Sequence, residues 1–186
     1  MKEFSTKNNF CVFLTQADDL GRVVIPKEIR RTMRIREGDP LEIFTNHDGE
    51  VILKKYSPIG ELGEFASQYA ETLFKTSGFP VCITDKDSII AISGAPKKEL
   101  YEKPVSSDVE RIMEEKKHYF CSDGSRVPLT DNSDKYSAGV ISPIIAEGDI
   151  IGNVIVIKDT DSANVTETEL KLANAASMFL AKQMEI

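Results

Sequence analysis

Residues 10–56 carry short apolar runs separated by turn residues, a pattern that predicts strands and one short helix. The four expected strands are Phe10–Leu14, Arg22–Ile25, Leu41–Phe44 and Val51–Leu53. The last two flank the turn Asn46–Glu50 and predict a hairpin. Pro26 favours a helix over Lys27–Met33, because proline is well tolerated at the first helical position. So few elements bury little apolar surface, and we expect this part to fold with a partner chain.

The residues after Tyr56 follow a different pattern, in which longer helices alternate with strands. Ser57-Pro58 interrupts the strand pattern and predicts a domain boundary, which gives domains 1–56 and 57–186. The expected helices are Ile59–Thr76, Ser106–Lys116 and Val165–Met184. The expected strands are Pro80–Thr84, Ser88–Ile92, Tyr119–Cys121, Ser137–Ala146 and Ile150–Lys158. Short turns between successive strands indicate an antiparallel sheet with packed helices, an α+β domain.

Charge is divided unevenly between the two parts. The whole chain has a net charge of −7, which by itself argues against a nucleic-acid partner. Residues 1–56 nevertheless carry ten Lys and Arg against nine acids, and the excess acid lies in residues 57–186. Six cations gather within fifteen residues beside a single acid, Glu28: Arg22, Lys27, Arg30, Arg31, Arg34 and Arg36. Arginine suits phosphates and base edges, so this cluster indicates either a nucleic-acid surface or a solvated basic face.

Cysteines and histidines provide no catalytic or metal-binding pattern. Cys11, Cys82 and Cys121 are widely spaced and form no Cys-x-x-Cys pair, so we expect reduced thiols. His47 lies in a turn sequence and His118 follows a charged run, and two histidines exclude a His-rich zinc site. No phosphate-binding glycine loop or serine-nucleophile motif occurs. We therefore expect no catalytic residue, no metal, no cofactor and no enzymatic activity.

Targeting signals are also lacking in the sequence. The longest apolar runs fall far short of the ~20 residues that span a bilayer. Met1-Lys2 is followed by polar residues and not by the apolar core of an export signal. We expect a cytoplasmic protein with no membrane partner.

The stretch Asp18-Asp19-Leu20-Gly21-Arg22-Val23-Val24-Ile25-Pro26-Lys27-Glu28-Ile29-Arg30-Arg31 resembles the opening of AbrB-type transition-state regulators. The continuations Arg36–Phe44 and Asp48–Tyr56 extend the resemblance to the end of the first domain. The acidic second domain, ending in Phe179–Glu185, resembles the GAF domain of sporulation regulators in this family. The resemblance implies a swapped-hairpin β module, in which strands of two chains interlock as an intertwined dimer, followed by a GAF-like domain.

That family resemblance also implies a function. It implies a sequence-specific regulator of transcription that binds double-stranded DNA, both activates and represses genes, and acts in the forespore on the nucleoid. It implies an N-terminal homodimer and a homotetramer formed through the GAF domain. Family members place DNA-contacting arginines where this chain has Arg22, Arg30 and Arg31. We add Lys27, Arg34 and Arg36 because of their charge and proximity.

One departure from the family pattern concerns the strand before the acidic pair. The family normally has two basic residues there, and this chain has Thr15 and Gln16. Two phosphate or base contacts per chain are therefore missing, unless Lys2 and Lys7 replace them.

Three alternatives follow from the same residues. GAF domains commonly hold a small ligand, and this one either binds an unidentified ligand or serves only as an oligomerisation module. Some GAF-like proteins reduce methionine sulfoxide with a set of cysteines, for which Cys82 and Cys121 are too few. Swapped-hairpin modules also occur in antitoxins. Antitoxins usually append a short disordered tail, whereas residues 57–186 are patterned as a folded domain.

Overall fold

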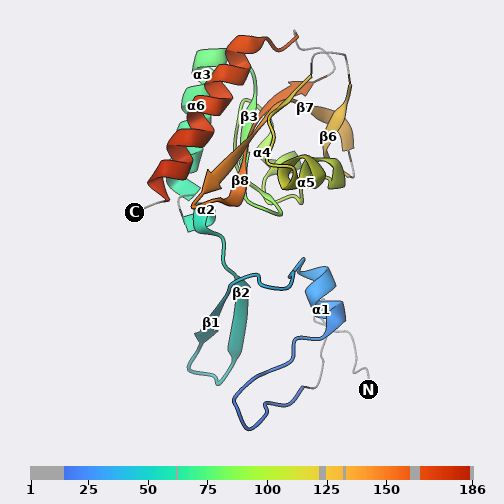
Figure 1. The fold of residues 1–186 in the computed structure, drawn as a ribbon, viewed down its shortest axis with the longest axis vertical. Coiled ribbons are helices and arrows are strands. Elements are labelled where there is room, and N and C mark those ends of the chain that lie inside the picture. Colours follow the sequence, from blue (N-terminus) through green and yellow to red (C-terminus); the bar gives the residue numbers. More distant parts are fainter. Residues whose placement is uncertain (1–14, 62, 122–124, 132, 160–163, 185–186) are drawn as a thin grey trace. The chain divides into compact units, whose positions relative to one another are not determined.

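The computed structural model describes residues 15–61, 63–121, 125–131, 133–159 and 164–184. Contacts divide the chain into two compact units, Met1–Tyr56 and Ser57–Ile186 (Figure 1). The expected strand Phe10–Leu14 and the thiol of Cys11 lie outside the described residues.

The described residues of the N-terminal unit, 15–56, form one short helix and one hairpin. Its elements are α1 (Lys27–Thr32), β1 (Leu41–Thr45) and β2 (Val51–Lys55). The hairpin turn is closed by Asn46, whose side-chain oxygen accepts the backbone N–H groups of Asp48 at 3.1 Å and Glu50 at 2.9 Å. The expected strand Arg22–Ile25 is not formed, and only one isolated bridge joins Val23 to Ala17. The hairpin and helix predictions are confirmed, and this strand prediction is wrong.

None of the described residues in the N-terminal unit is buried. In the hairpin, Ile43 faces Leu53 and Phe44 faces Ile52, and the two pairs lie on opposite faces because side chains alternate along a strand. Ile43 is 67% exposed and Phe44 is 46% exposed. A hairpin that is apolar on both faces needs cover on both faces, since two strands alone are marginally stable in water.

The C-terminal unit is an antiparallel sheet with helices on both faces. Its helices are α2 (Pro58–Glu61), α3 (Gly63–Ser77), α4 (Lys97–Leu100), α5 (Ser107–Glu114) and α6 (Glu167–Gln183). Its strands are β3 (Val81–Thr84), β4 (Ile89–Ser93), β5 (Tyr119–Phe120), β6 (Val127–Thr130), β7 (Ser133–Ala146) and β8 (Asp149–Asp159). The strand order is β4-β3-β8-β7-β5, and β6 also pairs with β7.

All the strands expected in this unit are present, and the structure adds two elements that the sequence pattern did not predict. Strand β6 contains a proline, Pro128, and α4 is a single turn. The expected helix Ile59–Thr76 corresponds to α2 and α3, which lie on either side of residue 62, a position outside the described residues. A mixed helix and sheet architecture was predicted, and it is confirmed.

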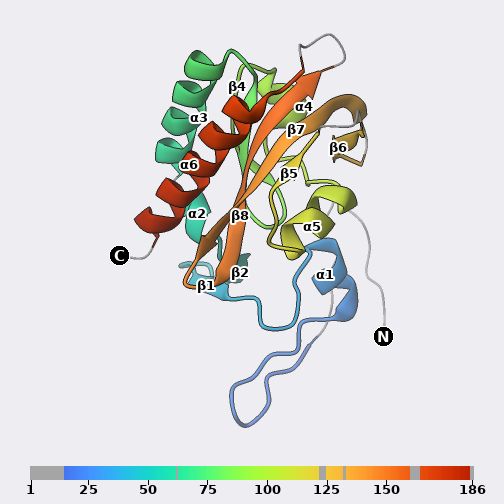
Figure 2. The same ribbon diagram turned by 45° about the horizontal axis from the view of Figure 1, so that its top comes forward.

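Two apolar clusters lie on opposite faces of the sheet. In Figures 1 and 2, α3 and α6 run side by side across one face, and α4 and α5 lie on the other. The first cluster combines α3 and α6 with alternate strand residues such as Val154 and Val156. The second cluster combines α4 and α5 with Ile155 and Ile157, which alternate with Val154 and Val156 along β8. Because side chains alternate between the two faces of a strand, the same sheet contributes to both clusters.

Helix α6 begins with a capping box. Thr166 accepts the N–H of Thr168 at 3.2 Å, and Glu169 Oε2 accepts the N–H and O–H of Thr166 at 2.7 and 2.6 Å. Burial acts to raise the pKa of the Glu169 carboxyl, but the hydrogen bonds from Thr166 outweigh burial and leave the pKa below its ordinary value of 4.5. The ionised form is therefore favoured in the folded chain.

We expect Glu169→Gln to lower the unfolding free energy of the C-terminal unit by about 1 kcal/mol at neutral pH. A carboxyl with a depressed pKa stabilises the fold above its unfolded-state pKa, and the contribution is lost as pH falls through the folded-state pKa. The difference in unfolding free energy between the unmodified chain and Glu169→Gln should therefore reach its full value above about pH 5 and disappear on acidification. Urea unfolding at a series of pH values measures it. The exposed Glu167→Gln is the control, and an equal, pH-independent loss in both variants would contradict the role of the box.

Candidate nucleic-acid interface

Arg22 leaves a tight turn that is organised by Asp18. One carboxylate oxygen of Asp18 accepts the backbone N–H groups of Leu20 at 3.0 Å and Arg22 at 2.8 Å. Gly21 takes a φ of 75°, which favours glycine, and its N–H reaches the carbonyl oxygen of Asp18 at 3.0 Å. The backbone N–H of Arg22, followed by its guanidinium, lowers the pKa of the Asp18 carboxyl. Asp18 is therefore a turn-forming residue as well as the partner of Arg22.

The guanidinium of Arg22 is held but remains accessible. Its Nε lies 2.7 Å from the second carboxylate oxygen of Asp18, and its side chain is 73% exposed. This contact uses one of the five N–H donors of the guanidinium. The terminal nitrogens of Arg22 remain able to reach a phosphate or a base edge.

Helix α1 carries three of the predicted site residues. Lys27, Arg30 and Arg31 are all exposed, and their i, i+3 and i+4 spacing places them on one side of the helix. Ile29 is half-buried. Within the described part of the chain, no ion pair or side-chain hydrogen bond engages these three cations. The helix therefore presents a row of unneutralised positive charge.

Arg34 and Arg36 belong to the segment that follows α1. Arg34 lies beyond the end of the helix at a φ of 52°, and its carbonyl oxygen accepts the Nζ of Lys55 at 2.8 Å. The backbone N–H of Arg36 donates to Asp39 Oδ2 at 2.8 Å. The helical row of cations thus ends at Arg31, and Arg34 and Arg36 follow a separate, tethered loop.

Lys55 and Asp39 are the residues that sequence reasoning missed. Lys55 Nζ lies 2.9 Å from Asp39 Oδ2, and both side chains are largely shielded from water. Together with their bonds to Arg34 and Arg36, they attach the segment after α1 to the end of β2. The sequence signal was weak, because a lysine at the end of a strand and an aspartate after Gly38 are common at exposed turns.

Thr15 and Gln16, which replace the basic pair of the family, are both exposed. The Thr15 hydroxyl donates to the carbonyl oxygen of Val24 at 3.1 Å. Thr15 thus ties the segment before the turn to the segment after it. Six of the eight Lys and Arg residues within residues 15–56 lie in Arg22–Arg36.

The cysteines of the C-terminal unit do not form a reactive pair. Cys82 belongs to the cluster under α4 and α5, whereas Cys121 packs against the cluster under α3 and α6. Burial raises the pKa of the Cys82 thiol to about 12, so its reactive thiolate form is scarce at neutral pH. The Cys121 thiol donates to the carbonyl oxygen of Ser125 at 3.0 Å. This arrangement argues against the cysteine-dependent reductase alternative.

The described residues offer neither a metal site nor a membrane-spanning helix. These residues contain no cluster of three or more His, Cys, Asp or Glu side chains arranged to hold a metal ion. None of the described helices is both long enough and apolar enough to span a membrane.

Comparison with known families gives two matches. The family described as "Stage V sporulation protein T C-terminal, transcription factor" matches residues 61–185, more than half of the chain. The family described as "Antidote-toxin recognition MazE, bacterial antitoxin" matches residues 14–61.

Individual proteins give a consistent result. Stage V sporulation protein T of Bacillus subtilis (strain 168) is 50% identical over 169 residues, which are 90% of this chain and 94% of that protein. Transition state regulatory protein AbrB of the same strain is 58% identical over 43 residues, 23% of this chain and 44% of that protein.

The fold of the C-terminal unit also occurs in a solved structure. The GAF domain/HD domain protein from Geobacter sulfurreducens superposes with a TM-score of 0.52 at 16% identity, covering 66% of this chain and 91% of that one. At this identity the likeness shows a GAF-like fold and nothing further. The sequence matches carry more, and they show that this chain belongs to the stage V sporulation protein T family of transcription factors.

Proposed function

We propose that this chain regulates sporulation genes by binding double-stranded DNA through Arg22 and the α1 cations of an intertwined N-terminal dimer. The observation that carries the proposal is the row of exposed, unneutralised cations at Lys27, Arg30 and Arg31 beside the accessible Arg22. Arg34 and Arg36 extend the same charged segment. On this proposal residues 1–56 are the DNA-binding domain and residues 57–186 the GAF-like oligomerisation domain.

The mode of DNA recognition follows from the shape of this surface. A helix of six residues is too short to serve as a long recognition helix in the major groove. Cations on a turn and a short helix suit phosphates and groove edges, so DNA shape and deformability contribute much of the specificity. The excess acid of residues 57–186 repels DNA and leaves the N-terminal unit as the binding surface.

Two kinds of self-association belong to the proposal. Pairing through the N-terminal hairpin supplies cover for its two apolar faces. The C-terminal unit pairs through an aromatic group on α3 and α6, where Tyr69 and Phe179 stack at 5.5 Å and Phe65 lies 6.0 Å from Phe179. Phe179 remains 42% exposed. Two different surfaces, each used once, build a homotetramer.

The cellular setting is part of the same proposal. A family whose members include a sporulation protein suggests a cytoplasmic, nucleoid-associated regulator of forespore genes that activates some and represses others. The geometry of Cys82 and Cys121 supports a non-enzymatic role.

The antitoxin alternative is supported by one observation, the MazE match over residues 14–61. Against it, the identity of the N-terminal unit to AbrB is 58%. Residues 57–186 form a folded unit with two buried clusters, unlike the flexible toxin-wrapping tail expected of an antitoxin. The regulator is therefore the better supported function.

Salt dependence of DNA binding tests the proposal. The full chain should bind a duplex recovered by selecting genomic fragments on the immobilised protein. Six phosphate contacts, made by Arg22, Arg30 and Arg31 of each subunit, predict that log K falls with log salt with a slope of about −5. Fluorescence anisotropy of the labelled duplex between 50 and about 300 mM salt measures this slope. Failure to select any duplex, or a slope near zero, would contradict the DNA-binding surface.

A further inference from the structure

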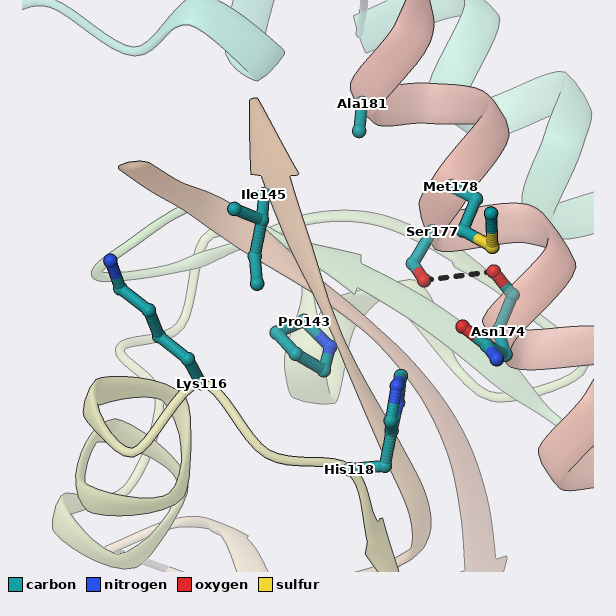
Figure 3. A pocket seen from close by; sticks show the side chains of 8 residues that line it. All are labelled: Lys116, His118, Pro143, Ile145, Asn174, Ser177, Met178 and Ala181. Carbon is teal, nitrogen blue, oxygen red and sulfur yellow. Dashed lines mark hydrogen bonds between the residues drawn. The ribbon is translucent and has the colours of Figure 1, made fainter. Parts of the chain in front are cut away.

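A hollow in the C-terminal unit lies between α6, β7 and the segment before β5. Its volume is about 340 Å³, within the range of small-ligand sites. It is lined by Lys116, His118, Pro143, Ile145, Asn174, Ser177, Met178 and Ala181 (Figure 3). It lies on the α6 face of the sheet, and the cluster on the α4 and α5 face is a separate part of the core.

A chain of hydrogen bonds forms the polar side of this hollow. Ser177 donates its hydroxyl hydrogen to the carbonyl oxygen of Asn174 at 3.0 Å. Ser142 and Ser177 are buried, with their hydroxyl oxygens 2.8 Å apart, and Ser142 lies 3.0 Å from Nδ1 of His118. Three polar side chains in an otherwise apolar layer must satisfy one another, because an unpaired buried hydroxyl is costly.

The direction of the chain follows from counting hydrogens. Each serine has one hydroxyl hydrogen. One arrangement satisfies all three bonds: Ser177 donates to the carbonyl oxygen of Asn174, Ser142 donates to Ser177, and Nδ1 of His118 donates to Ser142.

The same chain leaves Nε2 as the remaining polar atom of His118. In Figure 3 the side-chain amide of Asn174 extends from α6 toward His118, so the two groups flank one end of the hollow. Histidine and asparagine side chains both carry N–H groups that can donate to a carboxylate.

The rest of the lining defines the other half of the ligand. Pro143, Ile145, Met178 and Ala181 form an apolar wall beside the polar end. Lys116 stands on the rim, where its Nζ donates to the carbonyl oxygen of Gly148 at 2.6 Å. The eight lining residues include a lysine and no carboxylate. The charged residue of the lining is therefore a cation, which suits an anion with a short aliphatic part.

We propose that this hollow binds a small aliphatic carboxylate, with the carboxylate held by His118 and Asn174 and the aliphatic part lying against Ile145 and Met178. The site extends the role of the C-terminal unit beyond self-association to small-molecule binding. Its test does not depend on DNA.

Hexanoate is the probe, and a labelled methionine methyl group reports its binding. The full chain contains five methionines, so a ¹³C-methyl spectrum is simple, and Met178→Leu assigns the signal of interest. We expect hexanoate to shift the Met178 methyl signal in a saturable way. Met113, buried on α5, is the internal reference and should not move. Acetate lacks the aliphatic part and hexanamide lacks the charge, so both should bind at least about tenfold more weakly.

Variants locate the site. Asn174→Ala removes the amide and keeps a good helix former. His118→Gln keeps a donor for Ser142 but removes the imidazole ring. Each should raise the dissociation constant of hexanoate about tenfold, as expected for a lost hydrogen bond to a charged group. Lys116→Gln should raise it a few-fold, whereas Lys97→Gln, an exposed lysine on α4, should leave it unchanged. An unmoved Met178 signal, an equal response to hexanamide, or unchanged affinity in the folded Asn174→Ala variant would overturn the proposal.

Discussion

Replacing Arg30 and Arg31 together by alanine is expected to reduce DNA affinity on the order of a thousandfold at 0.1 M salt. The double change removes four of the six proposed phosphate contacts in a dimer, so the salt slope should fall from about −5 to about −2. Folding should not suffer, because neither side chain is engaged by a described residue and alanine favours the helix. Anisotropy titrations at several salt concentrations, with a thermal melt of each protein, measure both quantities.

The matched control changes the net charge by the same amount elsewhere. Lys97 and Lys98 lie next to each other on α4 and are exposed, as Arg30 and Arg31 are on α1. Lys97→Ala with Lys98→Ala should leave affinity and slope unchanged. If the two double variants lose the same affinity, the overall charge of the chain and not the α1 surface governs binding.

A charge-preserving variant separates phosphate attraction from arginine geometry. With lysine at both positions the salt slope should remain near −5, because the number of neutralised phosphates is unchanged. Affinity for the selected duplex should still fall by about tenfold or more, since lysine cannot make bidentate contacts. Equal affinity of the lysine variant would show that the two arginines act only as point charges.

Much of the fold could be predicted from local patterns. The hairpin of β1 and β2 follows from short apolar runs on both sides of a turn. The first residue of the turn, Asn46, accepts backbone N–H groups with its side-chain oxygen, as asparagine commonly does in turns. The long strands β7 and β8 follow from apolar runs around Glu147-Gly148-Asp149. Helix α6 follows from its capping box. In each case, residues close together in the sequence are enough to predict the element.

Other features depend on distant contacts and could not be predicted. The run Arg22–Ile25 is β-branched, but in the described chain only Val23 finds a strand partner, through one bridge. Strand β6 contains a proline and depends on its pairing with β7. The contact of Lys55 with Asp39 joins residues sixteen positions apart, and no local pattern specifies it. The cations of the proposed site were visible as a cluster, and the predicted helix Lys27–Met33 placed Lys27, Arg30 and Arg31 on it. The attachment of the Arg34–Arg36 segment to Lys55 and Asp39 was not predicted.

The apolar hairpin of the N-terminal unit gives a reason to expect that the unit pairs with a second chain. Phe44 and Ile52 lie opposite each other on one face, and Ile43 and Leu53 lie on the other. Within the described residues, α1 is the only helix of the unit, and its Met33 cap is itself 43% exposed. The described residues of the unit therefore lack the apolar surface to cover both faces. In the proposed dimer the hairpin of a partner chain, identical and equally apolar, supplies it.

Phe44→Asp is expected to abolish pairing through the N-terminal unit and DNA binding with it. A carboxylate at the centre of an apolar interface costs several kcal/mol without a partner. This cost exceeds the stability in reserve of a unit none of whose described residues is buried. Sedimentation should show a particle of half the mass, and DNA affinity should fall at least about a hundredfold. The melting transition of the C-terminal unit should be unchanged, because its core contains no residue of the hairpin.

His47→Asp is the matched control for this result. His47 lies in the exposed turn of the same hairpin, three residues from Phe44, and the substitution introduces the same charge. It should leave the mass and the melting transitions unchanged. If Phe44→Asp also retains its full mass and its DNA affinity, the apolar faces of the hairpin are not the dimer interface. The arginines of two chains would then have to be brought together by the C-terminal unit alone. A loss of mass in both variants would instead point to the added charge and not to the burial of Phe44, so the difference between the two variants is the quantity that decides the assembly.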